Sequence, residues 1–499
     1  MRSAFIVSCR SLCVLVVFIA VTLSAHAQFT LVQISVDKFK NSDSDHRTEV
    51  EPDIFAWGNT IVATYHVARR PGTIGWGSAA IGFSTSTDGG KTGTYGYLPD
   101  LTVNYKGGSY YGAADPSVAY DAKHGVWLIS SLALINPIGD VVVSRSTDGI
   151  HWGNPILVDG THNDDKNWTV CDNTSTSPYY GNCYTEWDAA TSTGDIEMST
   201  SSDGGLTWGP AKTTADFAGG LGGQPVVQPN GTVIVPFSES YAGVGAFRST
   251  NGGASWSSSV TIALVDNHSE GGGLRSLPLP SAEIDGAGKV YVVWQDCRYR
   301  SGCAENDIVM STSTDGKTWT SPPTRIPIDP LTSTVDHFIP GIGVDPKTSG
   351  SSAHLTLVYY YYPISNCNSN CQLDVGFTTS LDGGATWTAG AQLAGPMQLS
   401  WLPVSDLGPM VADYIAVSYS NGNPFGVFAA AKAPSGSLLN EAMYTTKQPL
   451  LAADDAPRFS SKGELPLPNA KSDHPLKAFY DDEGRFPTPE SKLPPRDQK

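Results

Sequence analysis

The sequence predicts an all-β protein folded as a single β-propeller. Two observations carry this prediction: a composition of 52 Gly, 12 Trp and 21 Tyr with only 16% charged residues, and a short motif that recurs six times. Low charge with many turn-forming and aromatic residues favours short strands joined by turns, and disfavours a helical bundle, a coiled coil or a disordered chain.

The recurring motif is an octad of the form Ser-x-Asp-x-Gly-x-x-Trp, with some copies one residue shorter. Its Ser and Asp side chains can bond the backbone N–H groups of a hairpin turn, its Gly supplies positive φ, and its Trp covers the turn. A spacing of about 60 residues suits repeated blades of four short strands. The acidic positions of the six copies are Asp88, Asp148, Asp203, Asn251, Asp315 and Asp382.

This octad is the Asp box, and with six copies the chain resembles the sialidase-like, or BNR-repeat, propellers over about residues 29–450. The resemblance implies propeller blades but says little about activity. Two copies depart from the pattern: Gly93 replaces Trp in the first and Asn251 replaces Asp in the fourth. We expect both changes to weaken their turns without breaking the blades.

A second repeat, out of phase with the octads, counts the blades. Candidate inner strands begin at Glu51, Asp115, Asp165, Gln224, Leu279, Ile339 and Val411. We therefore predict seven blades, with six as the alternative. The N-terminal strand 29–36 has no blade of its own, and placing it as the outer strand of the last blade closes the ring and removes exposed edges. Catalytic members of the resembled family have six blades, so seven would set this chain apart.

The two ends of the chain differ from its middle. Residues 1–27 have the build of a secretory signal: two arginines, the apolar run 12–23 and the small-x-small site 25–27. The run is short for a membrane anchor, which is the alternative. We expect a secreted or periplasmic protein with no membrane contact after cleavage. Residues 28–450 form the propeller, and the Pro- and charge-rich residues 451–499 a disordered tail. The alternative is a tail that docks through Phe479, Tyr480 and Phe486.

Six cysteines remain after the signal, in three close pairs. In an oxidising compartment they predict three local disulfides. Zinc is the alternative, but no CxxC pair is present. We expect no cofactor, although the Asp-rich stretch 163–165 leaves a structural Ca²⁺ open. The predicted pairs are Cys171/Cys183, Cys297/Cys303 and Cys367/Cys371.

Function should be sought where loops enter the inner strands and leave the second strands, because these loops surround one end of the propeller. Residues that the sequence places there include His66, Arg69, Arg70, Asp115, Asp165, Lys166, Trp187, Asp188, Glu239, Arg275, Asp296, Arg298, Arg300, Asp336, His337, Tyr359 to Tyr362, Asp413 and Tyr414. For each, the alternative is a structural role in packing or in ion pairs between blades. Strand alternation sends about half of them away from any site.

Sialidase chemistry, as the resemblance implies it, needs three arginines around a carboxylate, a Tyr–Glu nucleophile pair and an Asp acid. The one Arg-Ile-Pro motif, 325–327, comes after the fifth octad rather than before the first. The available assignment is Arg70, Arg275 and Arg298 as clamp, Tyr360 or Tyr361 as nucleophile, Glu239 as its partner and Asp115 as acid. Further candidate substrate contacts are Arg300, Asp296 and Trp187.

The leading hypothesis is a secreted, monomeric sialidase-like glycoside hydrolase that acts on an acidic extracellular glycan. The alternatives are a non-catalytic propeller that binds glycan or protein, and a polysaccharide lyase in which His66, His337 or a Tyr removes a proton. The formal net charge of −17 opposes nucleic-acid binding. If the three clamp arginines do not converge beside a Tyr–Glu pair, sialidase chemistry is excluded.

Overall fold

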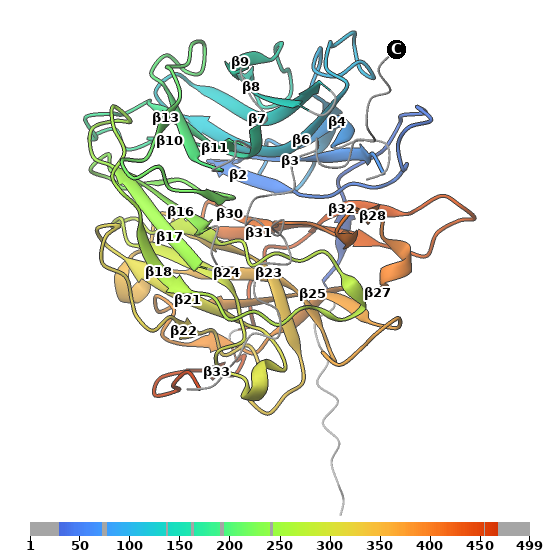
Figure 1. Cartoon of the computed structure of the whole chain (residues 1–499), viewed down its shortest axis with the longest axis vertical. Coiled ribbons are helices and arrows are strands. Elements are labelled where there is room, and N and C mark those ends of the chain that lie inside the picture. Colours follow the sequence, from blue (N-terminus) through green and yellow to red (C-terminus); the bar gives the residue numbers. More distant parts are fainter. Residues whose placement is uncertain are drawn as a thin grey trace, which may run out of the picture.

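The computed structural model describes residues 29–71, 77–135, 138–160, 164–189, 194–239, 243–453 and 455–467. The expected signal and the tail beyond residue 467 lie outside these ranges. The described chain is almost entirely β-strand (Figure 1). Its helical pieces are four short 3-10 turns, at Gly271–Gly273, Ser301–Cys303, Gly350–Ser352 and Leu399–Trp401. None of its helices is long and apolar enough to cross a membrane.

The first two four-stranded units form one eight-stranded sheet. They are joined where Ser78 pairs with Ala113, and the Ser78 hydroxyl donates to the Ala113 carbonyl at 2.8 Å. The first unit contains β2 (Asp53–Trp57), β3 (Thr60–Arg69), β4 (Ser78–Ser86) and β5 (Thr94–Tyr97). The second contains β6 (Gly112–Asp121), β7 (Val126–Ile135), β8 (Ile138–Ser146) and β9 (Ile156–Asp159).

Five further sheets are separate, each with four or five strands. The first has β10 (Asp164–Cys171), β11 (Cys183–Ala189), β12 (Ile196–Ser201) and β13 (Lys212–Thr213). The second has β14 (Gly220–Leu221), β15 (Val226–Val227), β16 (Val233–Glu239), β17 (Gly243–Ser249) and β18 (Val260–Leu264). The third has β19 (Ser281–Ile284), β20 (Val290–Asp296), β21 (Asp307–Ser313) and β22 (Thr324–Arg325).

The fourth separate sheet has β23 (Asp336–Val344), β24 (Leu355–Tyr362), β25 (Gln372–Ser380) and β27 (Ala391–Gln398). The fifth has β30 (Ala416–Ser420), β31 (Asn423–Ala431), β32 (Glu441–Thr446) and β1 (Leu31–Gln33). Two small pairs complete the strands: β26 (Trp387–Thr388) with β33 (Arg458–Phe459), and β28 (Val404–Ser405) with β29 (Gly408–Pro409).

The sheets are arranged as a propeller. An inner strand of each unit contacts the inner strand of the next, and the last returns to the first, so these strands enclose a central axis. In order they are β2, β6, β10, β15, β19, β23 and β30. The predicted seven, or six, separate blades are not what the hydrogen bonding shows. Five sheets are separate, and the first two predicted blades merge, because the entry to β6 approaches the start of β4 closely enough to pair.

The N-terminal strand lies at the outer edge of the last sheet, where the sequence placed it. β1 pairs antiparallel with β32, from Leu31 opposite Thr446 to Gln33 opposite Tyr444. The first strand of the described chain therefore lies in the same sheet as β30, β31 and β32 and gives the edge of β32 a partner.

The octads form hydrogen-bonded turns. In the third, the Asp203 carboxylate accepts the N–H groups of Leu206 and Thr207 at 3.0 Å each. In the first, hydrogen bonds lower the pKa of Asp88 to about 2, and the bond from the Thr92 N–H has the largest effect. The fourth keeps the turn with an amide, because Asn251 accepts the Ser255 N–H at 3.0 Å and donates to its hydroxyl at 2.8 Å. The octad is thus a local turn device whose function is structural.

The three predicted disulfides are confirmed. Cys171 bonds Cys183, Cys297 bonds Cys303, and Cys367 bonds Cys371. Disulfides persist in oxidising compartments, so they fit an extracellular protein.

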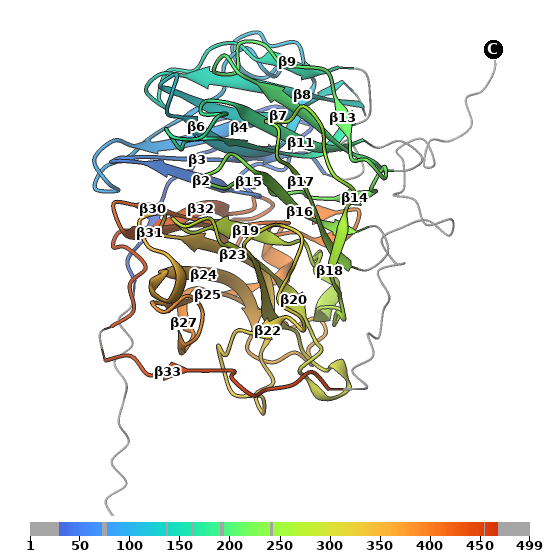
Figure 2. The same ribbon diagram turned by 90° about the vertical axis from the view of Figure 1, so that its left-hand side faces the viewer.

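Part of the predicted disordered tail is regular structure. Arg458–Phe459 forms β33, which pairs with Trp387–Thr388 of β26 and runs along the periphery beneath β27 (Figure 2). Farther on, the Leu467 N–H donates to the Arg298 carbonyl at 2.9 Å. Backbone hydrogen bonds to residues far away in the sequence hold this segment. Composition alone does not reveal such contacts. The aromatic residues proposed to dock the tail lie outside the described residues.

Candidate functional site

Three inner strands bring charged side chains together through the same backbone irregularity. Glu51, Asp115 and Lys166 adopt left-handed φ values of 55°, 45° and 48°. The register of β6 shifts between Ala114 and Ser117, and that of β10 between Asp165 and Trp168. Left-handed φ is costly for residues other than Gly, and such strain gathers at functional sites. The two bulges also re-aim side chains, and together with Glu51 ahead of β2 the three successive units direct charged groups to one place.

Glu51, His66 and Asp115 form the centre of this group. A Glu51 carboxyl oxygen lies 2.9 Å from His66 Nε2, and the Asp115 N–H donates to the same nitrogen at 2.7 Å. Because Nε2 accepts a backbone hydrogen bond, His66 is neutral, and burial lowers its pKa to about 4. Burial, reinforced by the charge of Asp413, raises the pKa of Glu51 to about 8. Glu51 therefore carries a proton at neutral pH and His66 does not.

Arg275 and Asp413 form the ion pair of the group. Arg275 Nε donates to Asp413 Oδ1 at 2.7 Å, and a second guanidinium nitrogen donates to Oδ2. Burial opposes ionisation of Asp413, but the charge of Arg275 outweighs it and lowers the pKa of this carboxyl. Asp413 also accepts a hydrogen bond from Glu51. The result is an ionised carboxylate beside a protonated one.

A second carboxyl pair lies beside the first. Burial and the charge of Glu51 raise the pKa of Asp115 to about 7, while burial and the charge of Asp115 raise that of Asp165 to about 7. Asp165 is half-buried, so the group reaches the surface at this residue. Each raised pKa favours the protonated form of its carboxyl, and the charge of Asp115 is part of the cause at Asp165.

Lys166 is the unusual cation of the group. It is only 5% exposed, and Nζ has no hydrogen-bond partner in the described part of the chain. Nζ lies 3.1 Å from the centroid of the Tyr414 ring and 5.4 Å from that of Trp168. A desolvated ammonium against aromatic rings is a strong electrostatic feature. We call Glu51, His66, Asp115, Asp165, Lys166, Arg275 and Asp413 the central cluster.

Two residues of β11 extend the acidic side. Gly222 donates its N–H to Asp188 at 3.3 Å and Gly223 to Glu186 at 3.2 Å. Burial raises the pKa of both carboxyls well above their usual range, and for Asp188 the charge of Asp165 adds to the effect. Carboxyl groups thus outnumber cations around the central cluster.

Few of the predicted site residues meet there. Asp115 and Arg275 belong to the central cluster. Arg70 faces elsewhere: it donates to Asp43 at 3.2 Å and to the Ser78 carbonyl at 2.8 Å, and lies 4.0 Å from the Tyr111 ring centroid. Because side chains alternate along a strand, its neighbour Arg69 takes the inward direction, where the charges of Arg275 and Glu51 act on its pKa.

The remaining clamp candidate, Arg298, and the substrate-contact candidate Arg300 both have internal partners. Arg298 is held by Asp296 at 2.8 Å and by the Leu264 carbonyl, so the predicted contact residue Asp296 is its counter-ion. Arg300 donates to Asp307 at 2.6 Å and to Asp329 at 2.8 Å. The disulfide Cys297–Cys303 encloses both arginines, but it holds them in internal ion pairs.

The aromatic and Glu candidates also lie apart from one another. Tyr360 is fully buried and donates its hydroxyl to the Ala429 carbonyl at 2.9 Å. Tyr361 packs its ring against His337 and Tyr359. Glu239 accepts the Thr261 hydroxyl at 2.9 Å, and Trp187 is fully buried. The clamp of three arginines beside a Tyr–Glu pair is therefore not formed.

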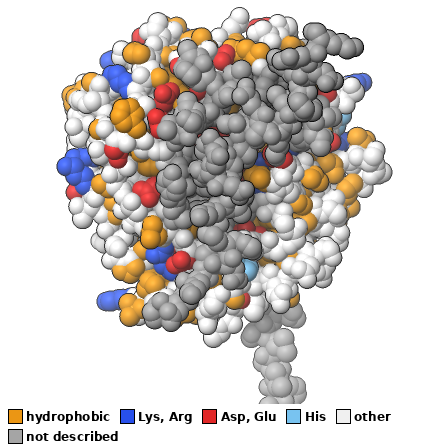
Figure 3. Space-filling view, in the orientation of Figure 1, with side chains coloured by type: hydrophobic (Ala, Val, Ile, Leu, Met, Phe, Trp, Pro, Cys, Tyr) orange, Lys and Arg blue, Asp and Glu red, His pale blue; other side chains and the backbone are white. Residues whose placement is uncertain are grey.

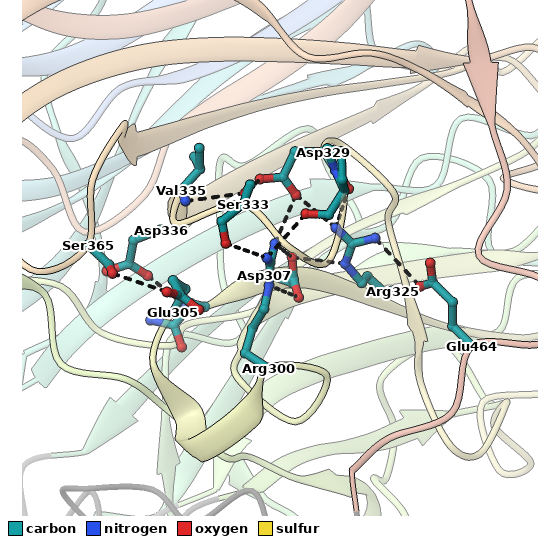
Figure 4. Close-up of polar contacts among 12 residues, drawn as sticks. Arg300, Glu305, Asp307, Arg325, Asp329, Ser333, Val335, Asp336, Ser365 and Glu464 are labelled. Carbon is teal, nitrogen blue, oxygen red and sulfur yellow. Dashed lines mark hydrogen bonds and ion pairs between the residues drawn. The ribbon is translucent and has the colours of Figure 1, made fainter.

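Arg300 belongs to a second polar group, which we call the arginine cluster: Arg300, Asp307, Arg325 and Asp329 (Figure 4). Asp307 lies 2.6 Å from Arg300 and 2.9 Å from Arg325, and Asp329 lies 2.8 Å from each. Glu464, from the C-terminal segment, approaches Arg325 at 3.5 Å. Each carboxylate of the arginine cluster thus has two guanidinium partners.

Two groups of described residues have the spacing of metal ligands, namely Glu51 with His66 and Asp115, and Asp307 with Asp329 and His337. Both sets lie beside cations: Lys166 acts on the pKa of Asp115, and Arg300 and Arg325 bond the second set. Neither set therefore fits a metal ion well, because His66 Nε2 of the first already accepts the Asp115 N–H and the carboxylates of the second already have guanidinium partners. Asp164 and Asp165, proposed for Ca²⁺, belong to neither set.

The surface has no basic patch on the face seen in Figure 3, where the Lys and Arg side chains of the described residues stand singly. This distribution agrees with the acidic net charge of −17.

No family model matches the chain, and neither does any curated protein. Among solved structures, the chain is similar to the Hadza microbial sialidase Hz136, at 15% identity and a TM-score of 0.42 over 81% of this chain and 66% of that one. It is similar to the intramolecular trans-sialidase from Ruminococcus gnavus, at 14% identity and 0.43 over 87% and 99%. A polysaccharide lyase of family PL25, an ulvan lyase, gives 9% identity and 0.46 over 82% and 96%. Likenesses this low carry no argument about activity.

Proposed function

We propose that this chain is a secreted glycoside hydrolase whose acid/base pair is Asp115 and Asp165. The observation that carries the proposal is that these two carboxyls belong to one buried group that reaches the surface at Asp165, where burial and neighbouring acidic charges raise the pKa of each to about 7. Glycoside hydrolysis needs one carboxyl that donates a proton and one that is ionised. A pair poised near neutral pH supplies both forms.

The neighbours of the pair support these roles. The protonated Glu51 and the ion pair of Arg275 with Asp413 fix the charge around Asp115. Lys166 supplies a positive charge next to both aspartates. The proposal does not include sialic acid, because Arg70 and Arg298 have internal partners and Tyr360 is buried in the core.

A lyase has less support in the central cluster. Its proton acceptor would be His66 or Tyr414, but His66 Nε2 already accepts the Asp115 N–H. Burial and nearby carboxylates raise the pKa of Tyr414 well above its usual range, so this phenol stays protonated. Neither group is a ready base at neutral pH.

The test is incubation of the secreted protein with neutral and acidic polysaccharides and with a fluorogenic sialoside. New reducing ends without unsaturated uronate absorbance indicate hydrolysis, whereas new reducing ends together with that absorbance indicate elimination. The variant Asp115→Asn should lose about 10²–10⁴-fold in hydrolytic rate. The matched control Glu239→Gln removes a half-buried carboxyl outside the central cluster and should keep full activity.

Three outcomes contradict the proposal. Unsaturated products indicate a lyase, and loss of activity in Glu239→Gln revives the sialidase assignment. If no polysaccharide is cleaved by wild type, the chain is a binding propeller instead.

A further inference from the structure

One tryptophan on the described surface lies open to solvent. Trp57, the last residue of β2, is 41% exposed, whereas the octad residues Trp152, Trp256 and Trp387 are buried. Its ring lies 5.3 Å from that of Tyr120, with the planes tilted by 31°. Tyr120 in turn lies 4.8 Å from the ring of Trp127, which is core. The exposed ring is thus the outer end of an aromatic row anchored in the interior.

The turn that follows Trp57 is fixed from two sides. The Gly58 carbonyl accepts the Ser420 hydroxyl at 2.8 Å and the Asn421 amide at 3.1 Å. The Asn59 carbonyl accepts the Gly89 N–H at 2.8 Å, from the first octad turn. Elements from the last sheet and from β4–β5 therefore hold this turn, and little conformational freedom remains to be lost when a ligand binds.

The Tyr120 ring backs the exposed Trp57 ring, because centroids 5.3 Å apart with planes tilted by 31° place the two rings partly over each other. Asn421 Nδ2 donates to Asn59 Oδ1 at 2.7 Å, so two amides lie at the turn that follows Trp57. An exposed indole face on a fixed turn, with amides at that turn, suits a pyranose ring, which offers C–H groups on its face and hydroxyls on its rim.

We propose that Trp57, backed by Tyr120, stacks on a pyranose unit of a polysaccharide, as a surface site distinct from the central cluster. Glu51 precedes β2 and Trp57 ends it, so at about 3.3 Å per residue the two lie roughly 20 Å apart along the strand. The site holds glycan at the opposite end of the strand from the acid/base pair. It stands independently of any hydrolytic activity.

The test is native affinity electrophoresis of the full secreted chain in gels with soluble β-glucan, galactomannan, xylan or amylopectin. Wild type should be retarded by at least one of them. Trp57→Ala should weaken that retardation by about tenfold in apparent affinity, and Trp57→Phe by less, because a smaller ring still stacks. Leu264→Ala is the matched control, since Leu264 is 70% exposed on β18 and should change nothing.

A second measurement needs no variant. N-bromosuccinimide should oxidise Trp57 before the buried tryptophans, and the retarding polysaccharide should slow that oxidation, as read by mass spectrometry. Asp115→Asn should keep the retardation, which separates this site from the acid/base pair. The proposal is overturned if Trp57→Ala is retarded as strongly as wild type, or if none of the four polysaccharides retards the wild type. The proposal is also overturned if Trp57→Ala changes only the sedimentation of the protein, because the exposed ring would then be a contact between protein copies.

Discussion

The central cluster and the arginine cluster contain the same types of charged side chain but differ in how their charges are balanced. In the arginine cluster, two guanidiniums face two carboxylates, and each carboxylate bonds both. In the central cluster only Asp413 has a guanidinium partner, while Glu51, Asp115 and Asp165 have raised pKa values. Matched charges fix one protonation state and one geometry. Surplus carboxyls leave protons that can move, which is what acid/base chemistry needs.

The largest effect is expected from breaking the matched cluster. Arg300→Leu should lower the free energy of unfolding by about 3–5 kcal/mol, because Asp307 and Asp329 lose a buried partner. Urea denaturation followed by tryptophan fluorescence measures it. Arg300→Lys is the control and should lose less, since it keeps the charge but not the two-pronged geometry. A loss below about 1 kcal/mol in the Leu variant would show that the cluster tolerates unmatched charge.

The corresponding change in the central cluster should lower the free energy of unfolding by a smaller amount. Arg275→Leu leaves Asp413 without its guanidinium, but a proton can replace the lost charge, so we expect a loss of about 1–3 kcal/mol. The folded-state pKa of Asp413 would then rise above its unfolded value. The loss should therefore be smaller at about pH 5 than at about pH 8. A loss equal at both pH values would mean that protons do not compensate there.

Asp165 tests the surplus of carboxyls in the central cluster. Its folded-state pKa of about 7 lies above its usual value of 3.8, so the folded state retains a proton that the unfolded chain releases. Stability therefore falls as pH rises from about 4 to about 7. Asp165→Asn removes this proton uptake and should flatten the pH profile, with a gain of roughly 1–2 kcal/mol near pH 7. An unchanged slope in a series of denaturation curves would contradict the raised pKa of Asp165.

The smallest effect is expected at the edge of the arginine cluster. Glu464→Gln removes the partly exposed contact to Arg325, and the two internal carboxylates still satisfy that guanidinium. The loss should be about 0.2–1 kcal/mol, within the range of surface ion pairs. Thermal unfolding at low and high salt measures it, and a larger loss would make the C-terminal segment part of the matched set.

Sequence reasoning recovered the fold because its signal is local. Each octad contains both donors and acceptors of its own turn, so the turn can be recognised without knowing what surrounds it. The join between the first two units was not visible, because Ser78 and Ala113 meet through tertiary approach alone.

The site was recovered only in part, for a geometric reason. A shift of one residue turns every side chain of a strand to the other face. Arg70 was chosen where Arg69 points inward, and Tyr360 points into the core. Glu51 was overlooked as a functional group, although Glu51-Pro52 repeats the acidic-Pro pattern of Asp115-Pro116 at the entry to an inner strand. That repeated dipeptide was the available signal.

The pairing of β1 with β32 bears on how the chain folds. Gln33 and Tyr444 meet across 411 residues of sequence, and their side chains bond at 3.4 Å. Nearly the whole chain must be synthesised before this contact can form, and closing so long a loop carries an entropic cost that local turns do not. The turns should therefore form early and the β1–β32 contact late. Joining the ends and opening the chain between β1 and β2 would leave only the segment with β33 and the joined ends between β32 and β1, so the loop to be closed would be much shorter.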